Sequence, residues 1–172
     1  SVPWTLGQAV NSNDFLVMER ATPQIMATAF GGGNPRTSLG FTSSDAHYFV
    51  GAWLTGPTTG ALHTAGAAGL GPQYSFLTRA AYTFTPTPVS TLHIGANYAN
   101  MFAPRTGTNA SGYAFADRPE VRLDPTTLFT IGTVPVSGGQ VIGGEAAASY
   151  QNAFIMGEYF HYMLDSKTGT TP

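Results

Sequence analysis

The chain alternates apolar and polar side chains at every second position in many short runs, a pattern that predicts β-strands. Turn-forming residues flank most of these runs, and helical periodicity is nearly absent. The predicted strands are 37–43, 46–55, 73–84, 90–102, 113–123, 139–150 and 153–164, with a weaker one at 127–132. The fold class is therefore all-β, and its strands are antiparallel wherever the connections are short.

Three pairs of strands are joined by short turns, and a short turn fixes the register of its hairpin. The turns are predicted at Ser44-Asp45, at 85–89 and at Gln151-Asn152. The predicted pairs are Phe41 with Tyr48 and Leu39 with Val50, then Tyr82 with Leu92 and Ala80 with Ile94, then Ala148 with Ile155 and Glu145 with Glu158. Each hairpin has one uncharged, largely apolar face. In the second and third hairpins every charge lies on the opposite face.

The lengths of the strands and loops favour a membrane barrel over a soluble sheet. The strands reach about 10–12 residues, and about 9–11 tilted residues cross a bilayer. Short turns follow the first strand of each hairpin, and long polar segments such as 56–72 and 103–112 follow the second, as in outer-membrane barrels. Aromatic residues also gather near the strand ends, namely Tyr82, Phe84, Tyr98, Phe102, Tyr159 and Tyr162. Because soluble sandwiches alternate their faces too, a soluble β-sandwich carbohydrate-binding module remains the alternative.

Composition and short motifs narrow the function classes further. Only 9% of the residues are charged, against about 25% in ordinary soluble domains. A net charge of −2 provides no basic surface for nucleic acid. There is no cysteine, the four histidines lack ligand spacing, and FGGGNP (30–35) lacks the Lys-Ser/Thr of a phosphate-binding loop. No metal or other cofactor is therefore predicted. No run of about 18 apolar residues is present, so no transmembrane helix is expected either.

The stretch FADRPEVRLD, residues 115–124, carries a charge at every second position: Arg118, Glu120, Arg122 and Asp124. In an extended strand these side chains share one face. We interpret that face as the wet side of a membrane strand. Pro119 has no backbone N–H for a ladder hydrogen bond, so the stretch is an edge, a bulge or a loop turned into the lumen.

Four further side chains are predicted on the polar face, at Arg79, His93, Glu145 and Glu158. Arg79 either attracts anions in a constriction or pairs with a carboxylate. Glu145 and Glu158 are expected about 5 Å apart across the strand pair, so they share a proton, an arginine or a cation. A retaining glycosidase also places two carboxyls at about this separation, which makes a β-rich glycoside hydrolase a third hypothesis. We favour hydrated wall carboxylates without a catalytic role.

Four motifs, in order along the chain, are similar to those of the phosphate-selective porins of the O/P family. VPWTLGQAVNSNDFLVMER resembles a family segment that ends in Phe-Met-Glu-Arg, and RAAYTFTP followed by STLHIGANY resembles an Arg-containing strand and a Leu-His-Leu-Gly strand. DRPEVRLDPTTLFTIG is similar to an Arg-Pro-Glu segment that leads to Thr-Gly. GGEAAASYQNAFIMGEYF is similar to a motif with Glu before a short turn and Glu-Tyr after it.

The resemblance implies a sixteen-stranded antiparallel transmembrane β-barrel of the bacterial outer membrane. Such a barrel contacts lipid and lipopolysaccharide, assembles as a homotrimer and passes small solutes or ions, including anions such as phosphate, by diffusion. It implies no catalysis. Because family members are longer, and because no signal peptide opens the chain, we expect an internal fragment with one partial barrel domain over 1–172. Within it we expect a loop or wall entry segment at 1–35, seven or eight strands over 36–164, and a loop at 165–172.

The sequence also departs from the family pattern. Phosphate-selective members line the pore with a column of Arg and Lys, whereas the chain has seven such residues in all. The carboxylates of Glu120 and Asp124 alternate with Arg118 and Arg122, and Gly7 stands where a Glu is common. The pore is therefore expected to be only mildly selective. Glu19 and Arg20 are expected to form a local ion pair in a loop near the wall.

Overall fold

The computed structural model describes residues 2–9, 36–58, 74–103, 113–117, 129–134 and 136–166, and all structural statements below refer to these ranges. They contain a short helix and eight strands. In chain order these are α1 (Leu6–Ala9), β1 (Arg36–Ser44), β2 (Tyr48–Thr58), β3 (Tyr74–Thr87), β4 (Ser90–Ala103), β5 (Tyr113–Asp117), β6 (Phe129–Val134), β7 (Val136–Tyr150) and β8 (Ala153–Ser166). The helix is too short to cross a membrane. The prediction of an all-β chain is confirmed.

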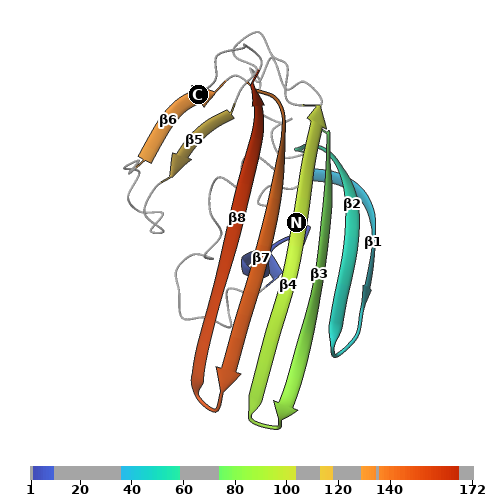
Figure 1. Ribbon diagram of the computed structural model, residues 1–172. Coiled ribbons are helices and arrows are strands. Elements are labelled where there is room, and N and C mark those ends of the chain that lie inside the picture. The colour runs from blue at the N-terminus through green and yellow to red at the C-terminus, as the bar shows by residue number, and fades with distance from the viewer. Residues whose placement is uncertain are drawn as a thin grey trace.

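Six of the strands form one antiparallel sheet in the order β1-β2-β3-β4-β7-β8. Strands β5 and β6 pair only with each other, in a separate two-stranded sheet. The predicted strand 113–123 is thus described over 113–117, and the charged stretch 118–124 falls in the connection between β5 and β6, outside the described residues. Figure 1 shows the long, tilted strands of the main sheet and their three hairpin turns together at its lower end.

The hairpin registers confirm the predicted faces but correct two of the three pairings. The third hairpin is as predicted, with Glu145 opposite Glu158 around the turn Gln151-Asn152. In the first, Phe41 pairs with Ala52 instead of Tyr48. In the second, Tyr82 pairs with Ile94 instead of Leu92. Both shifts are by an even number of positions, so every side chain remains on its predicted face.

Local turn chemistry explains the two shifts. In the first hairpin an Asp45 carboxylate oxygen accepts the backbone N–H groups of His47 and Tyr48, at 2.6 and 3.0 Å, which makes the turn longer than a two-residue loop. These hydrogen bonds hold the pKa of Asp45 below its usual range. In the second hairpin the turn contracts to Pro88-Val89, and the ladder is irregular between Phe84 and Thr87.

The two faces of the main sheet have opposite chemistry. We call the face that bears Leu77, Arg79 and Glu145 the inward face, because these side chains are buried. On the other face, the outer face, large apolar side chains are exposed. They include Leu39, Phe41, Val50, Leu54, Phe76, Tyr82, Leu92, Ile94, Ile142, Ile155 and Tyr159. A soluble sandwich would bury this apolar face, whereas a membrane barrel presents it to lipid.

A small apolar core lies on the inward face beside the charged residues. Trp53 of β2 lies over Gly40 of β1 and Gly51 of its own strand, where a β-carbon would collide with the indole ring. Two side chains of the segment before α1, Val2 and Trp4, join this core. The segment from residue 2 to residue 9 therefore packs on the inward face of the sheet, and we call it the inward segment.

The opposite faces of β7 can be tested with two adjacent alanines. Ala146 is exposed on the outer face, and Ala147 is half-buried on the inward face. We expect Ala146→Arg to lower the free energy of unfolding in a bilayer by about 2 kcal/mol, since a lipid-facing Arg is costly, and Ala147→Arg to cost clearly less. Urea unfolding in lipid vesicles measures both. Equal losses would contradict the assignment of the outer face to lipid.

Candidate functional site

The centre of the inward face is an ion pair between two strands that are not neighbours. Arg79 of β3 donates from Nη2 to Oε1 of Glu145 in β7 at 2.7 Å, and from Nε to both carboxylate oxygens at 3.1 and 3.2 Å. Strand β4 lies between them, and Gly95 stands opposite Glu145 in that strand. Because Gly95 has no side chain, the carboxylate can lie across β4 and meet the guanidinium.

The remaining surface of Arg79 is also occupied. Its Nη1 donates to the carbonyl oxygen of Pro3 at 3.3 Å, and its guanidinium carbon lies 5.1 Å from the centre of the Phe49 ring. Only 4% of Arg79 is exposed, and none of the Glu145 side chain is. Of the two roles that the sequence left open for Arg79, this geometry favours pairing with a carboxylate over binding of a passing anion.

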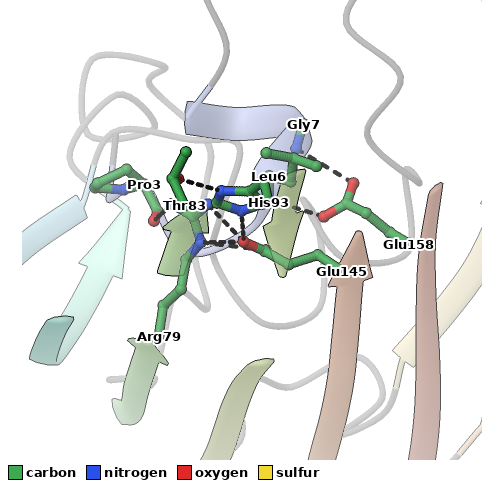
Figure 2. Close-up of polar contacts among 8 residues, drawn as sticks. All are labelled: Pro3, Leu6, Gly7, Arg79, Thr83, His93, Glu145 and Glu158. Carbon is green, nitrogen blue, oxygen red and sulfur yellow. Dashed lines mark hydrogen bonds and ion pairs between the residues drawn. The ribbon is translucent and has the colours of Figure 1, made fainter. Parts of the chain in front are cut away.

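His93 extends the ion pair toward the end of the sheet with the short turns. Its Nε2 lies 2.9 Å from Oε1 of Glu145, and its Nδ1 lies 3.1 Å from the hydroxyl oxygen of Thr83. Since an ionised carboxylate only accepts hydrogen bonds, Nε2 carries the proton in this arrangement. Figure 2 shows Arg79 and His93 both directed at the same carboxylate. The site thus joins β3, β4 and β7 through side chains.

Glu158 faces Glu145 across the strand pair, as predicted, but binds different partners. Its two carboxylate oxygens accept the backbone N–H groups of Leu6 at 2.8 Å and Gly7 at 3.2 Å. These donors lie at the start of α1, where N–H groups have no acceptor within the helix. The arrangement resolves the like-charge problem, since each carboxylate has its own set of donors. In Figure 2 the dashed lines join Glu145 to Arg79 and His93, and Glu158 to Leu6 and Gly7.

Asn97 is a further polar residue of the inward face, on β4 opposite Arg79 and Gly143. It is 3% exposed, and neither its Oδ1 nor its Nδ2 has a hydrogen-bond partner among the described residues. Its amide lies over Gly143, where a β-carbon would collide with it. Within the described residues, His, Asp and Glu form no group of three or more that could hold a metal ion.

The sequence placed Arg79, His93, Glu145 and Glu158 on one face. The structure joins the first three in one hydrogen-bonded network, and Glu158 binds the inward segment beside it. The other predicted site residues, Arg118, Glu120, Arg122 and Asp124 together with the ion pair of Glu19 and Arg20, lie outside the described residues. Sequence reasoning missed the inward segment as a partner of this network. No side-chain type signals these contacts, because Pro3, Leu6 and Gly7 bind Arg79 and Glu158 through backbone groups.

An apolar exposed face opposite a face with a buried ion pair is the arrangement of a membrane β-barrel wall, with the charged side directed at the interior. The protein is thus of the porin class in fold. The family model described as phosphate-selective porin O and P matches residues 1–172, and the chain belongs to that family. Membership implies the bacterial outer membrane and a channel class rather than an enzyme class. Comparison with curated proteins and with solved structures found no match.

The role of Gly95 as a gap for the carboxylate can be tested directly. A β-carbon at Gly95 would lie 2.5 Å from Oε1 of Glu145, whereas one at Gly144 would meet nothing within 4 Å. We expect Gly95→Ala to displace the carboxylate and to lower the free energy of unfolding by about 1–3 kcal/mol. Gly144→Ala, the matched control on β7, should leave stability unchanged or slightly raised. Equal stabilities of the two variants, measured by urea unfolding, would exclude the gap role.

The coupling of Arg79 and Glu145 gives a second prediction. Arg79→Met or Glu145→Leu alone leaves a buried charge without its partner and should cost about 3–5 kcal/mol. The double variant should cost clearly less than the sum of the single losses, because no unpaired charge remains. Urea unfolding of the three variants and the parent gives the four free energies of unfolding that a double-mutant cycle requires. Strictly additive losses would mean that the two side chains contribute independently.

Proposed function

We propose that the chain forms part of the wall of an outer-membrane porin that passes small hydrophilic solutes or ions by passive diffusion through a water-filled lumen. The observation that carries the proposal is the opposite chemistry of the two sheet faces. Ile94 and Ile155 are exposed on the outer face, 46% and 72%, while Arg79 and Glu145 are buried on the inward face. The matched family supports a channel of this kind.

Closure of the barrel requires strands beside β1 and β8, which are the two edges of the main sheet. Lipid provides no partner for the backbone N–H and C=O groups of an open edge, so an unclosed sheet is not stable in a bilayer. We propose that further strands pair with both edges in the membrane, and that the complete barrel assembles as a homotrimer in contact with lipid and lipopolysaccharide.

We propose that this part of the lumen discriminates only weakly between anions and cations. Among the Lys and Arg residues, Arg79 alone has a described side chain, and Glu145 neutralises it. A neutral ion pair attracts a passing ion much less than an unpaired guanidinium does. Anion preference, including any preference for phosphate, then depends on the basic residues predicted to line the pore elsewhere, Arg118 and Arg122.

Catalysis by Glu145 and Glu158 receives no support from the geometry. A retaining glycosidase needs one carboxyl free to attack the sugar and the other free to donate a proton. Here Glu145 accepts hydrogen bonds from Arg79 and His93, and Glu158 accepts two from backbone N–H groups. Both carboxylates are already used in holding the wall and the inward segment together.

The proposal predicts stepwise conductance when the intact porin is added to a planar lipid bilayer. In a potassium chloride gradient the reversal potential should be small, because Glu145 neutralises Arg79 and two backbone N–H groups offset the charge of Glu158. Glu145→Gln, which retains the size of the side chain and leaves Arg79 unneutralised, should shift the reversal potential toward anions. Absence of conductance steps would contradict the porin proposal, and an unchanged reversal potential in the variant would contradict the role of the pair.

A further inference from the structure

The inward segment is held against the sheet at three places on three strands. The carbonyl oxygen of Pro3 accepts a hydrogen bond from Arg79 of β3, and the indole Nε1 of Trp4 donates to the carbonyl oxygen of Tyr98 in β4 at 3.1 Å. At the third place Glu158 of β8 accepts the N–H groups of Leu6 and Gly7. These places span the sheet from β3 to β8, so the segment crosses the inward face instead of following one strand.

Packing fixes the first half of the inward segment. Trp4 and Thr5 are fully buried, and Val2 and Trp4 contact the core that contains Leu77 and Val141. The segment therefore occupies volume on the side of the wall that faces the lumen. Solutes that travel along this side must pass it.

In the second half of the inward segment, Glu158 accepts the N–H groups of Leu6 and Gly7, and the Leu6 side chain is buried. Two bonds to one carboxylate are stronger than neutral hydrogen bonds, because the acceptor is charged. A helix of four residues gives the N–H groups of Leu6 and Gly7 no acceptor of its own. Figure 2 shows the carboxylate of Glu158 reaching the start of α1 from the side opposite Arg79. Arg79 and Glu158 thus hold the segment from both ends of the site.

We infer that Glu158 is a positioning residue that holds the inward segment in the lumen and thereby sets the size limit for solutes. The inference rests on the proposed porin function. It differs from a direct effect of the Glu158 charge on ions, because size selection depends on where the segment lies, whereas ion preference depends on charge. The two effects are separable by measuring the permeation of uncharged sugars.

The first experiment compares the rates at which a monosaccharide and a trisaccharide enter vesicles that contain the intact porin. Each bond to a charged acceptor that is lost should raise the population of the displaced segment about tenfold. Glu158→Ala loses both bonds and should raise the ratio of trisaccharide to monosaccharide flux most. Glu158→Gln retains one acceptor oxygen, so its flux ratio should lie between those of Glu158→Ala and the parent.

The matched control is Asp165→Ala, which removes the same charge from the same strand. Among the described residues no hydrogen bond joins the Asp165 side chain to the inward segment, and the residue is exposed near the end of β8. Its flux ratio should equal that of the parent. A parent-like ratio in Glu158→Ala, or an equal rise in Asp165→Ala, would overturn the inference.

A second variant tests the inference without altering the strands. Trp4→Ala removes the buried anchor from the segment itself, so it should also raise the flux ratio while leaving the reversal potential unchanged. Adding Glu158→Ala to Trp4→Ala should then raise the ratio less than the two single effects combined. No rise in Trp4→Ala would mean that the segment does not limit solute size, even if Glu158→Ala fails to fold.

The position of the segment can be observed independently of any flux. In porin labelled with 5-fluorotryptophan, Trp4→Phe assigns the fluorine resonance of Trp4. This resonance should shift in Glu158→Ala, because loss of the bonds at Leu6 and Gly7 changes the surroundings of the adjoining Trp4, and it should not shift in Asp165→Ala. If the parent conducts no solute but the Trp4 resonance shifts in Glu158→Ala, the porin proposal is wrong, while Glu158 still holds the inward segment in place. If the parent conducts and the resonance does not move, the inference fails alone.

Discussion

Lipid on one face of a sheet restricts the positions at which charged side chains can lie near the middle of its strands. The outer face of this porin presents Ile94, Ile155 and other apolar side chains, so Arg79, Glu145 and Glu158 must all project inward. A charge that is both inward and buried needs a partner, and Glu145 supplies one to Arg79 across an intervening strand. The glycine at position 95, the placement of His93 and the path of the inward segment all follow from satisfying these charges.

The two faces could be predicted from the sequence because side-chain direction depends only on parity. Phe41 pairs with Ala52 instead of the predicted Tyr48, four positions away. Because this difference is an even number of residues, the face of each side chain is unchanged. The pairing of Glu145 with Glu158 was predictable for a further reason. A two-residue turn at Gln151-Asn152 leaves almost no freedom in the register of β7 and β8.

What the sequence did not predict depends on contacts between distant segments. The ion pair of Arg79 and Glu145 joins residues 66 positions apart, and no periodic pattern encodes it. The bonds from Leu6 and Gly7 to Glu158 join backbone groups to a side chain, so the amino acid types at positions 6 and 7 do not reveal them. The predicted length of the first hairpin turn was wrong for a local reason, because the carboxylate of Asp45 accepts hydrogen bonds from two N–H groups of its own turn.

The vacant position at Gly95 has a consequence for how the sequence of this porin can diverge. A side chain larger than hydrogen at 95 competes for the volume that the carboxylate of Glu145 occupies. The two positions should therefore change together during evolution: a lineage that acquires a larger residue at 95 should also replace Glu145, and then Arg79, which would otherwise remain charged and unpaired. The order of substitutions is constrained as well. Replacing Arg79 or Glu145 alone leaves the other as an unpaired buried charge. Once neutral residues occupy both positions, a larger residue at position 95 no longer displaces a carboxylate.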